Sequence, residues 1–254
     1  LKEAAALARA KNVQLHTHLC ETVDEEEYCR QVYGMRPVEY MESVGWLGED
    51  VWFAHGIHFN DDEINLLGRT KTGIAHCPTS NLRLGSGIAP VRALVDAGAR
   101  VGIAVDGSAS NDSSNMLREV QLAMLIHRIN SGVASMPAKL ALRLATRGGA
   151  AVLGRGDIGS IEPGKAADIA LFDIDTLAYA GAHHDPVAAV LFCGFDQRAW
   201  LTMVNGRIVV QDDYSGFVKG DKYDPLTSNR RPVPAPLLHQ AARSAIHAFV
   251  ADVT

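Results

Sequence analysis

The sequence has few cysteines, no block of basic residues and no long apolar run, and each shortage argues against a class of protein. Its four cysteines, Cys20, Cys29, Cys77 and Cys193, form no CxxC pair, which argues against a disulfide scaffold or structural zinc knuckle and favours a reducing cytoplasm. The net charge is −5 without a Lys/Arg cluster, so we expect no nucleic-acid and no membrane partner. No apolar run approaches the roughly 18 residues of a transmembrane helix, and no secretory signal is visible.

The 254 residues, 47% of them hydrophobic, are enough to bury a large core. Between residues 13 and 130, short apolar runs alternate with helical stretches. The runs are VQLHTH (13–18), VWFAHG (51–56), GIAHCP (73–78) and VGIAVDG (101–107). Such runs, with little polar alternation, are typical of parallel strands buried on both faces. Helices are predicted over residues 1–12, 60–69, 90–98 and 115–129.

Four βα units do not close a barrel, and a complete (β/α)₈ barrel takes about 250 residues. We therefore predict an α/β fold in which residues 1–155 form the second, C-terminal half of a (β/α)₈ TIM-type barrel, with the first half expected before them. Residues 156–215 are predicted to form part of a small β-sandwich, with two strands around Pro163-Gly164 and a hairpin around Asn205-Gly206. Residues 216–254 are predicted to be an extension that ends in a helix.

Ionisable residues follow the four predicted strands where each strand ends: His18, His55, His76 and Asp106. The carboxyl ends of barrel strands and the loops after them carry catalytic groups. Any one of these residues has an alternative as a core polar group, but four in succession favour a site. Imidazole and carboxylate are zinc ligands, and a hydrolytic site also needs an acid/base group. Glu21 is placed for that task; the alternative is a solvated acid at the head of a helix.

Several long motifs occur in a fixed order: HTHLCET (16–22), AHGIH (54–58), HCPTSNLRLGSGIAPVRALVDAG (76–98), VDGSASNDSSN (105–115) and GSIEPGKAADIALFD (159–173). Together they make the chain resemble the amidohydrolase superfamily over residues 13–210, in the branch of the guanine, cytosine and adenosylhomocysteine deaminases and the triazine hydrolases. Within that branch, HHDPVAAVLFCG (183–194) is most similar to the 8-oxoguanine deaminases.

The resemblance implies a role for each of four residues. His18 corresponds to a zinc-ligating histidine, and Asp106 to an aspartate that both binds zinc and accepts the proton of the attacking water. Glu21 corresponds to the glutamate that shuttles protons, and His55 to the histidine that hydrogen-bonds the water or the tetrahedral intermediate. His76 matches no role of the family and is expected to shape the pocket wall.

Other histidines and polar residues are given lesser roles. His16 is expected in the core or in support of the ligands, and Cys20 is expected to be a neighbour of the site and no ligand. His58, Ser110 and Asn111 are candidates to support the site. The family's first-strand HxH pair has no counterpart in these residues, so the remaining two ligands are expected outside this chain. Zn²⁺ is the expected metal, with Fe²⁺ as the alternative because imidazole and carboxylate suit both.

The function implied by the resemblance is zinc-dependent deamination of an amino-substituted heterocycle, with 8-oxoguanine, converted to urate and ammonia, as the first choice. One alternative is another ring hydrolase, such as an isocytosine, guanine or cytosine deaminase or a triazine hydrolase. Another is a non-catalytic relative without metal, against which the presence of His18, Glu21, His55 and Asp106 argues. We expect a cytoplasmic homo-oligomer whose ligand is a purine or a related small heterocycle.

Overall fold

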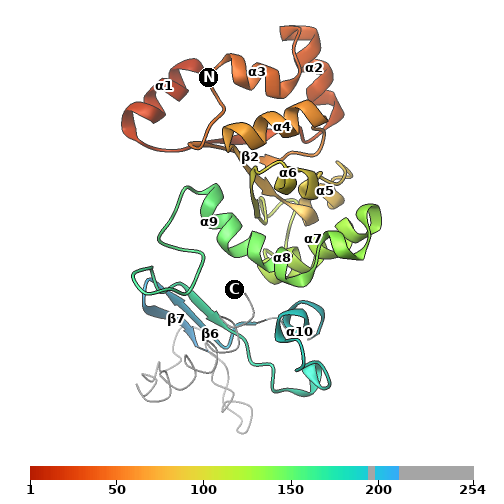
Figure 1. The fold of residues 1–254 in the computed structure, drawn as a ribbon, viewed down its shortest axis with the longest axis vertical. Helices are drawn as coiled ribbons and strands as arrows, with labels where there is room; N and C mark the ends of the chain where they lie inside the picture. Colours follow the sequence, from red (N-terminus) through yellow and green to blue (C-terminus); the bar gives the residue numbers. More distant parts are fainter. Residues whose placement is uncertain (194–197, 212–254) are drawn as a thin grey trace. The chain divides into compact units, whose positions relative to one another are not determined.

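The computed structural model describes residues 1–193 and 198–211. The chain divides into two compact units, Leu1–Gly159 and Ser160–Thr254 (Figure 1). The predicted extension over residues 216–254 and its helix lie outside the described residues. No helix within residues 1–193 and 198–211 combines the length and the apolar character that crossing a membrane requires.

The first unit is built on a four-stranded parallel sheet in the order β1-β2-β3-β4. Each strand lies within or next to one of the four apolar runs, and Phe53, Ile74 and Val101 are buried as expected for a covered sheet. The predicted α/β class with a parallel sheet is therefore confirmed. The strands are β1 (Leu15–Leu19), β2 (Val51–His55), β3 (Gly73–His76) and β4 (Arg100–Ile103).

Helices connect these strands at the places that the capping residues indicate (Figure 1). Asn60 begins α4 with a capping box, because its side chain accepts from the Glu63 backbone and the Glu63 side chain accepts in return. Asn115 caps α7 in the same position relative to its helix, accepting from the Arg118 N–H. The helices are α1 (Lys2–Lys11), α2 (Val23–Tyr33), α3 (Pro37–Ser43), α4 (Asp61–Thr70), α5 (Pro78–Arg83), α6 (Val91–Asp96) and α7 (Met116–Ser131).

The helical segment after Pro137 is interrupted. It consists of α8 (Ala138–Arg143), a π-helical segment over Leu144–Gly148, and α9 (Gly149–Val152). Gly148 lies so close to β4 that a Cβ atom there would overlap the carbonyl oxygen of Val101. The wider π turn occurs where this helix passes against the strand, which the sequence pattern does not reveal.

Gly148 and Gly149 provide a matched pair that tests this close approach. Both have right-handed helical backbone angles, but a Cβ atom on Gly149 would have no neighbour within 4 Å. We expect Gly148→Ala to lower the free energy of unfolding by about 2 kcal/mol, because the helix must move away from β4. Gly149→Ala should be neutral or stabilise by up to about 1 kcal/mol, since alanine favours the helix. Urea denaturation of both variants measures the difference; equal effects would contradict the proposed overlap.

The second unit contains an antiparallel sheet in the order β5-β6-β7. The predicted hairpin is confirmed: Asn205 and Gly206 have φ values of +46° and +77°, as a type I′ turn requires. The prediction of two strands around Pro163-Gly164 is half wrong, because residues 157–160 form bends, residues 161–162 have no regular structure, and neither pairs with a strand among the described residues. The described elements of the second unit are β5 (Ile169–Leu171), a 3₁₀ turn (Leu177–Tyr179), α10 (Pro186–Phe192), β6 (Leu201–Val204) and β7 (Arg207–Gln211).

Candidate functional site

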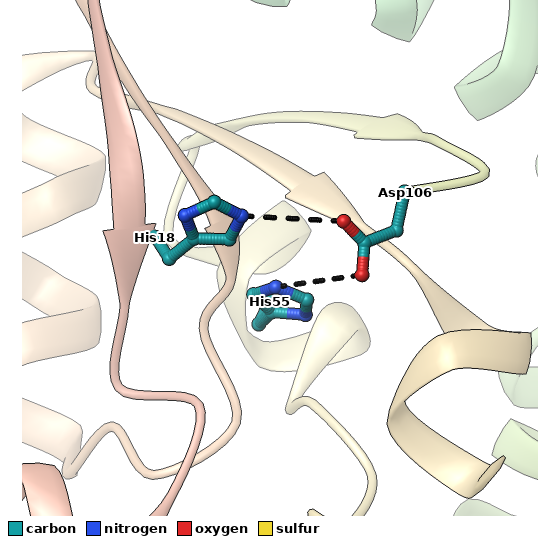
Figure 2. Close-up of side chains that lie close together, drawn as sticks. All are labelled: His18, His55 and Asp106. Atoms are coloured by element: carbon teal, nitrogen blue, oxygen red, sulfur yellow. Dashed lines mark ion pairs between the residues drawn. The ribbon is translucent and has the colours of Figure 1, made fainter. Parts of the chain in front are cut away.

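Three of the predicted residues converge at the carboxyl edge of the parallel sheet. His18 lies on β1, His55 ends β2, and Asp106 lies three residues beyond the end of β4. Figure 2 shows the two imidazole rings facing the two oxygens of one carboxylate: His18 Nε2 is 4.0 Å from Asp106 Oδ1, and His55 Nε2 is 3.9 Å from Asp106 Oδ2. One ligand atom from each residue lies within 4.8 Å of the other two. Residues far apart in the sequence thus form one compact group.

The backbone adopts unusual angles at this group. His55 and Asp106 have φ values of +73° and +62°, a left-handed conformation that non-glycine residues adopt infrequently and that is enriched at functional sites. At His55 the left-handed conformation occurs at the last residue of β2, and at Asp106 it occurs three residues after the end of β4. Asp106 therefore reaches the group from a loop, whereas the sequence pattern placed it at the strand end itself.

Glu21 joins the same group from the loop after β1. Its Oε2 atom is 3.5 Å from His55 Nε2, and its backbone N–H donates to Glu25 at 3.0 Å. The preceding residue, Cys20, is buried and accepts hydrogen bonds through its carbonyl oxygen from the backbone N–H groups of Ile57 and His58. These bonds attach the loop after β1 to the loop after β2, which brings Glu21 next to His55.

Asp106 is held as an ionised carboxylate by hydroxyl groups on one of its oxygens. Ser80 and Ser110 donate to Oδ2 at 2.5 and 3.1 Å. Burial tends to raise the pKa of Asp106, but these two hydroxyls, the backbone N–H of Gly107 and the nearby His55 together lower it below the ordinary value. Both serines bind Oδ2, whereas Oδ1 faces His18. Ser110, predicted only as a supporting residue, therefore contacts the proposed ligand directly.

A buried glutamate connects the segments behind the site. Glu119 on α7 accepts from the Thr79 backbone N–H at 3.0 Å, the Thr79 hydroxyl at 2.5 Å and Asn111 Nδ2 at 2.9 Å. Asn111 Nδ2 also donates to the Val105 carbonyl oxygen at 2.8 Å. Glu119 thereby joins the start of α5 to the loop that carries Asp106. Glu119 was not among the predicted residues, although it lies four residues before the buried Ala123 and so on the same face of α7.

Two of the strand-end and neighbouring histidines do not join the group. His16 stacks on Trp52 with ring centroids 3.6 Å apart, and its Nδ1 is 3.3 Å from the Trp52 carbonyl oxygen. His76 is fully buried, with its Nε2 atom 3.2 Å from His127 Nε2. Burial, together with His127 and His55 nearby, lowers the pKa of His76 to about 3, and burial lowers the pKa of His127 to about 4. His76 and His127 are therefore uncharged at neutral pH and act as packing residues.

The donor set suits a divalent metal of the first transition row. Two imidazoles and a carboxylate whose pKa is lowered are the ligand types that zinc binds, and their ligand atoms already lie together. The His18 side chain is 61% exposed, so its Nε2 is accessible. Cys20 is no part of this set, because burial raises the pKa of its thiol and the thiolate is the form that binds metal.

Comparisons with known proteins agree with this chemistry. A family model described as "Amidohydrolase family" matches residues 1–209. The chain is 49% identical to an 8-oxoguanine deaminase of Pseudomonas aeruginosa over 238 residues, which is 94% of this chain and 52% of that protein. It is 40% identical to a hydroxydechloroatrazine ethylaminohydrolase of a Pseudomonas species over 210 residues, 82% of this chain and 43% of that protein.

Solved structures give the same result. An atrazine chlorohydrolase from Arthrobacter aurescens, complexed with zinc, is 39% identical with a TM-score of 0.78, covering 82% of this chain and 46% of that one. An adenosine deaminase from Xanthomonas campestris with bound zinc is 27% identical with a TM-score of 0.80, covering 98% of this chain and 54% of that one. The chain spans about half the length of the curated relatives that it matches.

Proposed function

The chain belongs to the amidohydrolase family, and on that premise we propose that its protein removes an amino group hydrolytically from a small heterocycle. The observation that carries the proposal is the convergence of His18, His55 and Asp106, with Glu21 at 3.5 Å from His55. The 49% identity to an 8-oxoguanine deaminase supports 8-oxoguanine, converted to urate and ammonia, as the first substrate to test.

We assign to His18 and Asp106 the binding of one divalent metal ion, with zinc as the first choice and Fe²⁺ as the alternative. The ligand atoms of both residues belong to the same group, and zinc is present in both of the similar structures described above. A bound zinc ion supplies Lewis acidity, which lowers the pKa of a coordinated water to about 7. The other ligands are expected outside this chain.

The chain's own residues then divide the proton transfers between them. Asp106 is ionised because Ser80 and Ser110 hydrogen-bond its Oδ2, so it can accept the proton of the attacking water. Glu21 in its protonated form delivers its proton to the ring nitrogen beside the reacting carbon. It then takes the proton of the hydroxyl that has been added to that carbon and passes it to the amine nitrogen, which departs as ammonia. The proton held by Asp106 returns Glu21 to its starting form. His55 faces the same space from Nε2, where we assign it the acceptance of a hydrogen bond from the attacking water.

An ammonia-release screen over 8-oxoguanine, guanine, isocytosine, cytosine and aminotriazines tests this proposal on the full-length protein. We expect the highest kcat/KM with 8-oxoguanine, at least roughly tenfold above the next substrate, because a site that hydrogen-bonds a substrate group discriminates against rings that lack it. Chelator treatment should abolish the release and added zinc should restore it. A protein that released ammonia from none of these rings would contradict the proposed deamination.

A second candidate function is displacement of chloride or an alkylamine from a triazine. The likeness to an atrazine chlorohydrolase and to an ethylaminohydrolase favours it. The same residues would act on the ring, and only the leaving group would differ. Including chlorinated and alkylamino triazines in the screen separates the two, since release of chloride or alkylamine without ammonia identifies the second function.

A further inference from the structure

Asn81, on α5, is buried beside the site, and its Oδ1 atom lies 2.8 Å from Nδ1 of His55. We propose that Asn81 is a positioning residue whose side-chain carbonyl accepts the Nδ1 proton of His55 and thereby leaves Nε2 as the nitrogen that faces Glu21 and Asp106. The hydrogen bond follows from the structure alone; its consequence for the reaction rests on the proposed function.

The surroundings of His55 make its tautomer important. Nε2 is 3.5 Å from a Glu21 oxygen and 3.9 Å from an Asp106 oxygen. With its proton on Nδ1, the neutral ring presents a lone pair at Nε2 to two carboxylates, so three acceptors meet around one space. Such a group attracts a cation or a proton. With its proton on Nε2, the ring would instead donate a hydrogen bond to the Glu21 or Asp106 carboxylate. That carboxylate is one that we assign to proton transfer, and the hydrogen bond would compete with this role.

Of the two polar atoms of the Asn81 side chain, Oδ1 forms the hydrogen bond with His55. The Nδ2 amino group is buried and has no hydrogen-bond partner among the residues that the structure describes. A buried donor without a partner is costly, and an apolar side chain of similar size would avoid that cost. Among the described residues, the bond to His55 is the only hydrogen bond of the Asn81 side chain, which supports a role in positioning that ring.

Helix α5 holds the site through three successive residues. Thr79 is fixed by Glu119, Ser80 donates to Asp106, and Asn81 binds His55. The residue that orients the metal-binding carboxylate and the residue that orients the imidazole are therefore neighbours on one short segment. Partners of this kind fix the tautomer and ring orientation of a histidine at metal sites.

Nitrogen NMR of the zinc-loaded, full-length protein labelled with ¹⁵N-histidine tests the proposal at a pH where the ring is neutral. We expect His55 of the unaltered protein to carry its proton on Nδ1. Asn81→Ala should move the proton toward Nε2 and lower kcat by about 10- to 100-fold, with a smaller effect on KM. Asn81→Asp, which keeps an acceptor at Nδ1, should restore the Nδ1–H form. His16 is an internal reference, because its Nδ1 lies near a backbone carbonyl that these changes leave in place.

Asn60→Ala is the matched control, because it removes another hydrogen-bonding asparagine, the cap of α4, and should leave the His55 tautomer and kcat unchanged. A His55 protonated only at Nε2 in the unaltered protein would overturn the proposal, even if Asn81→Ala did not fold. An unchanged His55 spectrum in Asn81→Ala would also overturn it. A tautomer that shifts as expected in a protein that releases no ammonia from any ring would instead contradict the proposed function and leave the role of Asn81 standing.

Discussion

Asp106→Asn should abolish metal binding and lower kcat/KM by roughly 10⁴-fold, because we assign to this carboxylate both a ligand and a proton acceptor. The substitution keeps the shape of the side chain. Ser80 and Ser110 can still donate to an amide oxygen at the position of Oδ2. That arrangement turns the new NH₂ group toward His18, where Oδ1 lies now, and an amide NH₂ is a donor that binds no cation.

Zinc content by atomic emission and ammonia release measure the two effects separately. The unaltered full-length protein is expected to contain about one zinc per chain, and Asp106→Asn almost none. Asp112→Asn is the matched control, because Asp112 lies in the same loop, pairs with Arg83 and has a side chain that is 76% exposed. It should keep zinc and activity within about twofold, as surface substitutions usually do. Full ammonia release from zinc-loaded Asp106→Asn would show that the assigned role is wrong.

The sheet and its site edge could be predicted because parallel strands leave a strong local pattern. Four apolar runs gave the positions of β1 to β4, and strands that run in parallel bring their carboxyl ends to one edge. The hairpin around Asn205-Gly206 was equally local, since the type I′ turn depends on two adjacent residues. A strand before Pro163 was predicted wrongly, because a strand also needs a partner, and local sequence contains no information about one.

Position at a strand end could not by itself rank the residues around the site, and the family resemblance was needed to separate them. His55 and His76 both end an apolar strand, yet the left-handed backbone at His55 brings it to Asp106, whereas His76 packs against His127 in the core. Their strand-end positions do not distinguish them, whereas the resemblance does, because it assigns a role to His55 and none to His76. Asn81 was also missed, although it lies within a motif used for the resemblance. Its role depends on a contact with a residue 26 positions away in the chain.

Glu21→Gln should lower kcat by about 10²- to 10⁴-fold, the usual contribution of a general acid/base, while zinc binding is retained. Glu21 lies 3.5 Å from His55 and is separate from the three residues whose ligand atoms group together. Gln keeps the size and polarity of the side chain but neither takes up nor releases a proton near neutral pH. Retained zinc with lost turnover therefore distinguishes Glu21 from Asp106, whose replacement should remove both.

The leaving group gives a sharper test of Glu21. Ammonia departs only after the amine nitrogen gains a proton, whereas chloride departs as an anion without one. The loss caused by Glu21→Gln should therefore be smaller for a chlorinated ring than for the corresponding amino-substituted ring, if the protein acts on both. Glu27→Gln, an exposed position on α2, is the control and should leave both rates and zinc content unchanged. Unchanged ammonia release in Glu21→Gln would instead support the alternative that Glu21 is a solvated acid at the head of α2.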